Sequence, residues 1–297
     1  METTVIITSF KDRRIFKTID SLKKQTRPPD HVLIADGGSP SDFERDVRDY
    51  IRGDPRFSYN IMRGRCSDTR RKAIYALVLA PYQYHRTDIM VWIDADMTAF
   101  DDWLEELVRP IENDEADFTG GVWKRGEEKS KAEKILNQIM VKNQLLAMED
   151  PAYIGMGNSA WSAEILKKLG GLDASSESDM ADEGLGREGI VSGYYVSEDF
   201  DLNIRAIDAG FKGTFVPEAA VYHDQSHVNT FRKLTMYFYN NYVRAGMAYF
   251  KNKSTMGKFV KGSSIGDIAH PFELFLLLIK PIAFVSAWKE YNKIKGK

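Results

Sequence analysis

The chain has 297 residues, of which 43% are hydrophobic and 28% charged, as is typical of a soluble globular protein. Its formal net charge of −2 argues against a general nucleic-acid-binding protein, because such proteins usually carry a basic excess. The single cysteine, Cys66, excludes an internal disulfide bond and fits a cytoplasmic location. The first residues, METTVIITSF, predict a strand rather than a signal peptide, because they contain no basic stretch followed by a long apolar run.

The first hundred residues alternate short apolar runs with helical patterns. Four runs predict strands: TVIITSF, HVLIAD, RFSYNIM and DIMVWID. Three intervening segments have apolar residues at helical spacing: DRRIFKTIDSLKKQ, SDFERDVRDYI and SDTRRKAIYALVLA. This alternation predicts an α/β protein, with a Rossmann-like sheet of parallel strands covered by helices on both faces.

The rhythm changes after Phe100. Helical patterns follow in DDWLEELVRPI, SKAEKILNQIMVKNQLLAM, SAEILKKLGGLD, SEDFDLNIRAIDAG and NTFRKLTMYFYNNYVRAGMAYF. DFTGGVW predicts one strand, and FKGTFVPEAAVYHD predicts two short strands. We expect one domain over residues 1–226, with halves that meet near residue 100, and a C-terminal helical appendage over residues 227–297.

Polar segments follow each of the four predicted parallel strands. They are Thr8–Phe10, Asp36–Ser39, the pair Arg63 and Arg65, and Asp94–Asp96. In open α/β sheets, ligands bind beyond the carboxyl ends of the strands. We therefore expect these four segments to converge on one crevice.

The stretch VWIDADM places two carboxylates, Asp94 and Asp96, at the end of a buried strand. Packing alone does not require such a pair. Oxygen ligands of this kind suit Mg²⁺ or Mn²⁺, which often link one or two protein carboxylates to the phosphates of a substrate. The alternative is that both aspartates are solvated acids at a strand end.

Five segments, taken in order, resemble glycosyltransferase family 2, the large inverting family with the GT-A fold. They are DSLKKQTRPPDHVLIADGGSPSD, TRRKAI, VWIDADM, GNSAW with LGGLD, and SEDFDLNIRAIDAGFK. The resemblance spans about residues 3–224, and the order and spacing of the segments make it specific. It implies a mixed sheet, with a nucleotide-binding half over residues 1–100 and an acceptor half over residues 101–226.

The resemblance also implies roles for individual residues. The donor sugar nucleotide would be bound by Thr8, Ser9, Phe10, Asp36, Arg70, Asp94 and Ala95. The metal would be held by Asp96 and Asp94, with His223 as a candidate third ligand, and the catalytic base would be Asp199, with Glu198 beside it. The acceptor would be bordered by Trp123, Gly155, Asn158 and Trp161. One departure is Arg71, which stands where the family has an asparagine after the arginine that corresponds to Arg70.

The implied reaction is metal-dependent transfer of a sugar, with inversion, from a nucleotide-diphosphate sugar to a hydroxyl of a glycan or lipid-linked acceptor. Inversion in one displacement needs a general base, and the departing diphosphate needs cationic help. The sequence leaves the nucleotide, the sugar and the acceptor open. Alternatives are a sugar-phosphate nucleotidyltransferase and a non-catalytic glycan- or lipid-binding relative; a dinucleotide-dependent dehydrogenase is disfavoured because no G-x-G-x-x-G follows the first strand.

Two segments depart from the family pattern. The acidic stretch 174–193 precedes Asp199, and we expect it to act as a lid over the bound donor or acceptor. The apolar stretch Phe272–Trp288 is interrupted by charged residues, so no membrane span is expected. Residues 272–291 instead predict an interfacial helix at the cytoplasmic face of a membrane, or a helix packed on the domain or in a dimer contact.

Overall fold

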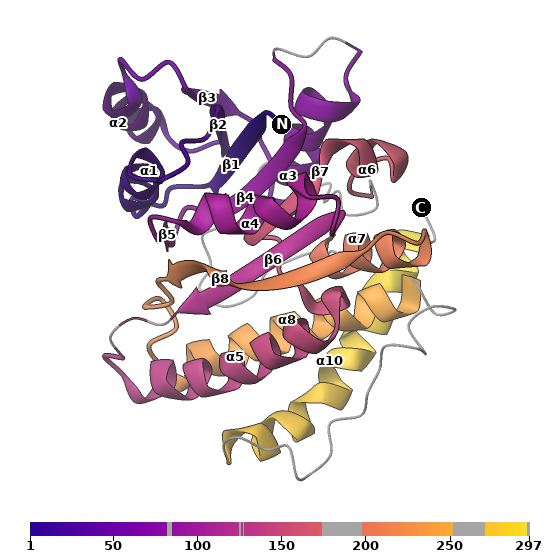
Figure 1. The fold of residues 1–297 in the computed structure, drawn as a ribbon. Helices are drawn as coiled ribbons and strands as arrows, with labels where there is room; N and C mark the ends of the chain where they lie inside the picture. Colours follow the sequence, from indigo (N-terminus) through magenta and orange to yellow (C-terminus); the bar gives the residue numbers. More distant parts are fainter. Residues whose placement is uncertain (82–84, 125, 127, 174–197, 252–270, 296–297) are drawn as a thin grey trace.

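The computed structural model describes residues 1–81, 85–124, 126, 128–173, 198–251 and 271–295. Within this part, eight strands form one sheet in the order β3-β2-β1-β4-β7-β6-β8-β5 (Figure 1). The strands are β1 (Thr3–Ser9), β2 (His31–Asp36), β3 (Phe57–Ile61), β4 (Ile89–Asp94), β5 (Met97–Ala99), β6 (Phe118–Lys124), β7 (Asn158–Ser162) and β8 (Gly213–His223).

The first four long strands form the parallel half that the alternating pattern predicts. β1 pairs in parallel with β2 and β4, and β2 pairs in parallel with β3. The register aligns Thr8 with Ala35 on one side and with Asp94 on the other. The carboxyl ends of these strands therefore lie at one edge of the sheet. β7 runs antiparallel to β4 and β6, which makes the sheet mixed.

Helices cover both faces of the sheet, because successive residues of a strand point to opposite sides. Val5 and Ile7 pack against α1, α2 and α4, whereas Ile6 faces the other side, which α3, α6 and α7 cover. The described helices and helical turns are α1 (Ile15–Lys23), α2 (Ser41–Ile51), α3 (Cys66–Ile74), η1 (Tyr75–Leu79), α4 (Trp103–Glu112), α5 (Lys131–Glu149), η2 (Pro151–Tyr153), α6 (Ala163–Lys168), α7 (Glu198–Asp208), α8 (Phe231–Lys251) and α10 (Phe272–Lys295).

The prediction of two short strands in FKGTFVPEAAVYHD is wrong, because β8 is one continuous strand. Its partner β6 pairs with it on both sides of an irregularity, in which Gly121 aligns with Val216 and Val122 aligns with Ala220. Three residues of β8, including Pro217, are accommodated by this bulge. Proline has no backbone N–H to donate, so a bulge in the ladder tolerates it.

The short strand β5, which the sequence pattern did not reveal, pairs antiparallel with the end of β8. Met97 aligns with His223 in this pairing. β5 begins one residue after Asp96, so the pairing brings His223 next to the second aspartate of VWIDADM.

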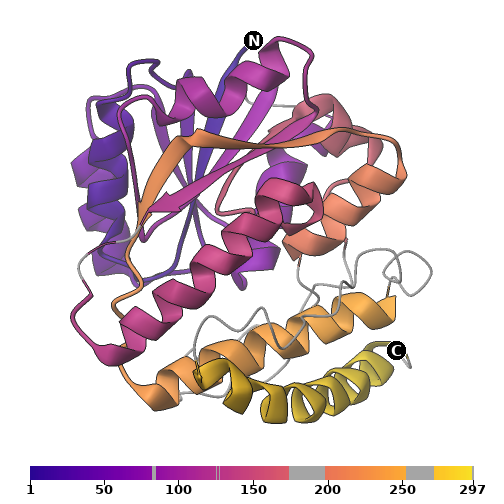
Figure 2. The same ribbon diagram turned by 60° about the horizontal axis from the view of Figure 1, so that its bottom comes forward.

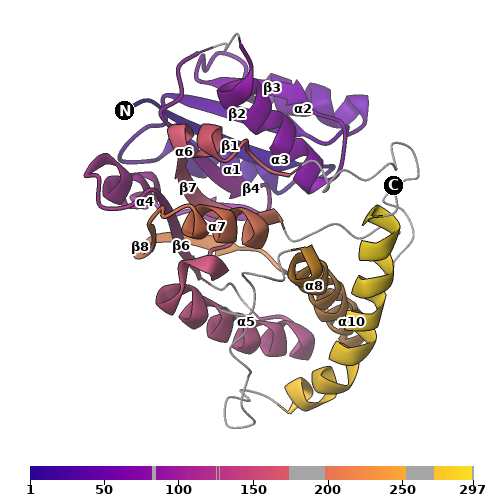
Figure 3. The same cartoon turned by 90° about the vertical axis from the view of Figure 1, so that its right-hand side faces the viewer.

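The C-terminal helices form a layer below the sheet. α8 lies between α10 and the rest of the molecule, and α10 is the outermost element (Figures 2 and 3). The two helices approach closely along a seam of small residues: a Cβ added at Gly246 would lie only 2.7 Å from the Cβ of Ala287. Among the described helices, none combines the length and apolarity needed to cross a bilayer.

Candidate active site

A pocket of about 210 Å³ opens where the carboxyl ends of the parallel strands meet. Every one of the four strand exits contributes to its wall, as the predicted sheet requires. The lining residues are Thr8, Ser9, Phe10, Asp12, Gly37, Gly64, Cys66, Thr69, Asp94, Ala95 and Asp96. The structure thus brings together segments that lie up to 88 residues apart in the chain.

Asp36, a predicted donor-binding residue, is fully buried and is not among the residues that line the pocket. Its Oδ2 accepts hydrogen bonds from the backbone N–H groups of Gly38 at 2.9 Å and Ser39 at 2.6 Å, and its Oδ1 accepts one from the Ser39 hydroxyl at 2.6 Å. The carboxylate therefore fixes the loop whose Gly37 lines the pocket. Gly37 has no room for a side chain, because a Cβ there would lie 2.8 Å from the Gly64 carbonyl oxygen.

Arg70 joins two carboxylates from distant parts of the chain. Its Nη2 donates to Asp94 Oδ1 at 2.5 Å, and its Nη1 donates to Glu198 Oε1 at 2.9 Å. Arg70 is only 5% exposed, so solvent screens these ion pairs little. The arginine thus connects α3, the end of β4 and the first residue of α7.

Burial raises the pKa of Glu198 above its ordinary value, although the Arg70 charge opposes that shift. The position of the other carboxylate, Asp94, requires a residue without a side chain at position 157. A Cβ at Gly157 would lie 2.3 Å from Asp94 Oδ2, so a larger residue there would displace the carboxylate.

Replacement of Arg70 by methionine should destabilise the protein by about 3–5 kcal/mol, because Glu198 would be left buried without its cation. The unpaired Glu198 would take up a proton more readily, so its folded-state pKa would rise further above the unfolded value. The free energy of unfolding of R70M should therefore fall more steeply than that of the wild type as pH rises from about 5 to 8. Chemical denaturation across this range measures both effects.

The double variant R70M/E198Q is the matched control for this prediction, because it removes the buried charge together with its partner. It should be more stable than R70M and should show no added pH dependence. An R70M protein as stable as the wild type at pH 8 would contradict the proposed ion pair.

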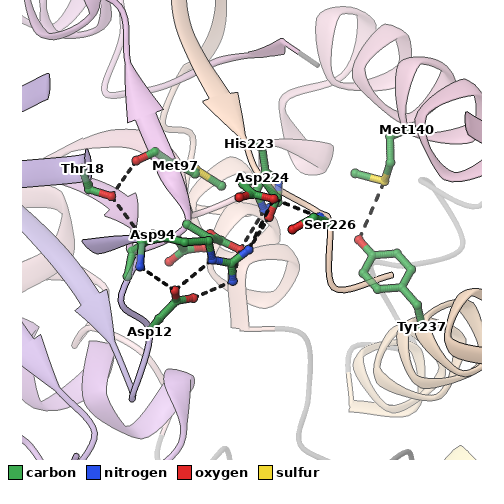
Figure 4. Close-up of polar contacts among 12 residues, drawn as sticks. Asp12, Thr18, Asp94, Met97, Met140, His223, Asp224, Ser226 and Tyr237 are labelled. Atoms are coloured by element: carbon green, nitrogen blue, oxygen red, sulfur yellow. Dashed lines mark hydrogen bonds and ion pairs between the residues drawn. The ribbon is translucent and has the colours of Figure 1, made fainter. Parts of the chain in front are cut away.

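The second aspartate, Asp96, contacts a different arginine, Arg14. Asp12, His223 and Asp224 belong to the same cluster of contacts (Figure 4). His223 Nε2 is 3.3 Å from Asp96 Oδ2, and Arg14 Nη2 is 3.6 Å from the same oxygen. Burial opposes ionisation of Asp96, but the hydrogen bond with His223 and the Arg14 charge give its pKa a net lowering. The backbone N–H of Asp224 donates to the Asp96 carbonyl oxygen at 2.9 Å, which ties the end of β8 to this loop.

Asp96 and His223 together offer one oxygen and one nitrogen ligand to a metal ion. Mn²⁺ accepts both donor types, and Mg²⁺ favours oxygen. Across the described residues, no group of three or more His, Cys, Asp or Glu side chains forms a ready-made metal site. The pair therefore fits a metal whose remaining ligands come from substrate phosphates and water, as is common for Mg²⁺ sites.

One predicted acceptor residue, Trp123, lies beside His223, and a second, Gly155, packs against Trp123. The rings of Trp123 and His223 meet edge to face with centroids 5.8 Å apart. Gly155 lies against the same indole, because a Cβ there would be 2.6 Å from the Trp123 ring.

The other two predicted acceptor residues are packed into the interior. Asn158 Oδ1 accepts a hydrogen bond from the Trp103 indole N–H at 2.7 Å, and its Nδ2 donates to the Val122 carbonyl oxygen at 3.2 Å. Trp161 is 1% exposed and stacks on Phe118 with ring centroids 4.3 Å apart. In this geometry both side chains serve packing and do not face the pocket, so we assign neither to the acceptor.

Asp199 lies in the first turn of α7, next to Glu198 and half-buried. Its Oδ1 accepts a hydrogen bond from the backbone N–H of Phe200 at 2.8 Å. The predicted lid, residues 174–193, lies outside the described residues.

Sequence reasoning missed three residues of the site: Asp12, Arg14 and Asp224. Arg14 binds Asp12 through Nε at 2.8 Å and Nη2 at 2.6 Å, and its Nη1 donates to the Asp224 carbonyl oxygen at 2.6 Å. The last contact joins residues 210 positions apart, so no local pattern could reveal it.

The mixed sheet, the helices on both faces and the pocket at the strand exits define a GT-A fold. The model of the family described as glycosyl transferase family 2 matches residues 4–169, which is more than half of the sequence, and the chain therefore belongs to this family. The predicted family, the GT-A fold and activity as a glycosyltransferase that uses nucleotide sugars are thereby confirmed.

A solved structure of similar fold is mannosyltransferase PcManGT from Pyrobaculum calidifontis in complex with GDP-Man and Mn²⁺. The TM-score is 0.58 at 16% sequence identity, and the alignment covers 97% of this chain and 73% of that chain. Among curated proteins, none matches the sequence.

Proposed function

We propose that this enzyme transfers a sugar with inversion from a nucleotide-diphosphate sugar to an acceptor hydroxyl, with a divalent cation at Asp96. The observation that carries the proposal is the pocket at the strand exits, where Asp94 and Asp96 lie together and Arg70 connects Asp94 to the start of α7. Residues 1–100 would bind the donor and residues 101–226 the acceptor, with residues 227–297 as a separate helical region.

Different residues would serve the leaving group and the acceptor. Thr8, Ser9, Phe10 and Ala95 line the pocket in which the donor would lie. A divalent cation, Mn²⁺ or Mg²⁺, held by Asp96 and His223 would neutralise charge on the departing diphosphate. Asp94, oriented by Arg70, would lie at the same end of the pocket.

Of the two neighbouring carboxylates Glu198 and Asp199, Asp199 is the better candidate for the general base. Glu198 is the better candidate for a residue that positions the start of α7. The Glu198 side chain is only 11% exposed and its carboxylate accepts a hydrogen bond from Arg70, so it is committed to holding the start of α7. Asp199 is half-buried and adjacent to it. A carboxylate in this place would accept the proton of the acceptor hydroxyl during the displacement.

The donor is tested by incubating the enzyme with GDP-, UDP- and dTDP-sugars, with and without Mn²⁺, and measuring release of the nucleoside diphosphate. GDP-Man with Mn²⁺ comes first, because the structurally similar PcManGT was solved with both. Metal-dependent release of diphosphate from one donor supports the proposal. Release of pyrophosphate from a nucleoside triphosphate with a sugar phosphate would identify a nucleotidyltransferase instead.

We also propose that α10 lies on the cytoplasmic face of a membrane. Leu276, Ala283 and Ala287 are buried against α8 and α5, whereas the opposite side of α10 is apolar and exposed. The exposed apolar residues are Leu274, Phe275, Leu277, Leu278, Ile282, Phe284, Val285 and Trp288. No charged residue interrupts this face between Leu274 and Trp288.

The charge at the end of α10 favours lipid over a protein partner. The face is convex and outermost in the molecule (Figure 2), so it can sink into a bilayer surface, where interfacial helices bury about 5–10 Å. Trp288 lies at the end of this face, whereas Tyr291 stacks on Phe250 of α8 with ring centroids 5.9 Å apart. The sequence that follows Trp288 contains Lys289, Lys293, Lys295 and Lys297. Lysines near the surface are each attracted to anionic lipid by about 1 kcal/mol. A membrane position would favour a lipid-linked acceptor.

Two glutamates on this face should abolish membrane binding. In the double variant L278E/V285E both positions are exposed, at 70% and 52%, so the fold should tolerate the change. Two aliphatic side chains would no longer be buried in the membrane when the protein binds, so binding to anionic vesicles should weaken by about 100-fold or more. Co-sedimentation with phosphatidylglycerol-containing vesicles measures it.

The matched control places the same charges on exposed apolar residues of another helix, as L145E/M148E on α5. This control should sediment like the wild type. Equal sedimentation of L278E/V285E and the wild type would exclude α10 as the membrane contact.

A further inference from the structure

Arg14 occupies the position next to Asp96 where a cation is expected to act. Its guanidinium lies 3.6 Å from Asp96 Oδ2 and 3.7 Å from Asp224 Oδ1. Two hydrogen bonds to Asp12, at 2.6 and 2.8 Å, and one to the Asp224 carbonyl oxygen hold it in this position. The carboxylates of Asp12, Asp96 and Asp224 thus surround the positive charge of Arg14; Figure 4 shows Asp12 and Asp224 on two sides of this cluster.

This charge bears directly on metal affinity. A metal ion held by Asp96 would share this carboxylate with the Arg14 guanidinium, which lies 3.6 Å from Oδ2. Like charges that share one carboxylate repel appreciably even at an effective dielectric constant of 20 to 80. The Arg14 charge therefore opposes binding of a divalent cation to the free enzyme, although it also keeps Asp96 ionised and oriented.

We propose that Arg14 is a positioning residue that makes cation binding depend on the donor. In the free enzyme Arg14 acts as the counter-cation of Asp96, and the metal site is weak. The diphosphate of the donor supplies negative charge that offsets the guanidinium, so metal and nucleotide bind together. The inference rests on the metal site of the proposed function, and it adds the order in which that site is filled.

The two consecutive arginines Arg13 and Arg14 make different contacts, and Arg14 is the one that contacts Asp96. Arg13 is 58% exposed and pairs with Asp42 and Asp46 on α2, away from the pocket. A substitution of Arg13 therefore changes the net charge of the chain by the same amount as one of Arg14, but it leaves the charges around Asp96 unchanged. This makes R13Q the matched control for R14Q.

The test measures the Kd of Mn²⁺ alone, by electron paramagnetic resonance of the free ion, for the wild type, R14Q, R14K and R13Q. R14Q should bind Mn²⁺ at least about tenfold more tightly than the wild type, because the repulsion is removed. R14K keeps the charge and R13Q keeps the cluster, so both should bind as the wild type does. The tighter binding should disappear in R14Q/D96N.

A second measurement repeats the titration with saturating GDP and with saturating UDP. In the wild type, whichever diphosphate binds should tighten Mn²⁺ binding strongly, and in R14Q the same diphosphate should tighten it less. By linkage, the Mn²⁺-dependent gain in affinity for that nucleotide should shrink by the same factor. A merely structural role for Arg14 would lower stability without sharpening metal affinity.

A folded R14Q protein with an unchanged or weaker affinity for Mn²⁺ overturns the inference; R14M is a second neutral variant should R14Q not fold. Failure of the proposed function gives a different result. If the wild type transfers sugar without any metal, and no variant binds Mn²⁺, the role of Arg14 is refuted while the transferase activity stands. If no nucleotide sugar binds at all, the proposed function itself is refuted.

Discussion

Replacing Asp96 with asparagine should lower kcat/KM for sugar transfer by about 10²- to 10³-fold. The amide is neutral, so it cannot supply the charge that a divalent cation needs, and the cation is expected to contribute several kcal/mol of transition-state stabilisation. Arg14 and His223 would also lose the carboxylate that they share. Steady-state kinetics over a range of Mn²⁺ concentrations measures the effect, and no concentration of Mn²⁺ should restore the wild-type rate.

Asp101 provides the matched control, because it is exposed and lies only five residues further along the chain. D101N should retain wild-type kinetics. A D96N enzyme with wild-type kcat/KM and unaltered Mn²⁺ dependence would remove Asp96 from the metal site and leave the pocket without its proposed cation.

Replacing Asp199 with asparagine should lower kcat by about 10²- to 10⁴-fold, the range that a positioned general base contributes. Donor binding should change little, because Asp199 is proposed to act on the acceptor hydroxyl and not on the nucleotide. The expected signature is a loss in kcat with nearly unchanged Kd for the nucleotide sugar and Mn²⁺. Isothermal titration alongside kinetics separates the two quantities.

Asp208 lies at the other end of the same helix and is exposed, so D208N is the control for charge loss on α7. It should be as active as the wild type. If E198Q loses far more activity than D199N while remaining folded, the roles of the two neighbouring carboxylates are reversed.

The parallel half of the fold could be predicted because its signals are local. Strands such as β4 are uninterrupted apolar runs, and α1 repeats apolar residues at helical spacing. β5 was missed because its three residues give no periodicity, and its existence depends on pairing with β8. β8 was predicted as two strands because a proline usually marks the end of a strand, and Pro217 lies within this segment. In the structure, Pro217 lies in a bulge of β8 opposite β6, and the strand continues past it.

The site was predictable only where a residue follows a predicted strand. Asp94 and Asp96 lie at the exit of β4, and the topology alone brings them to the pocket. The family resemblance already suggested His223 as a partner of these aspartates. The contacts of Arg14 and Arg70 with them were not predictable, because they are tertiary contacts across 24 residues or more. The family motif also gave no indication that the side chains of Asn158 and Trp161 are buried in the interior.

One pocket, between the strand exits and Asp96, is proposed to hold both the donor diphosphate and a cation. The decisive experiment is a crystal structure of the enzyme with its preferred nucleotide sugar and Mn²⁺. We expect an anomalous Mn²⁺ peak bonded to a carboxylate oxygen of Asp96 and to the diphosphate, with the nucleotide against Thr8–Phe10. A diphosphate bound elsewhere, or Mn²⁺ without contact to Asp96, would contradict this proposal.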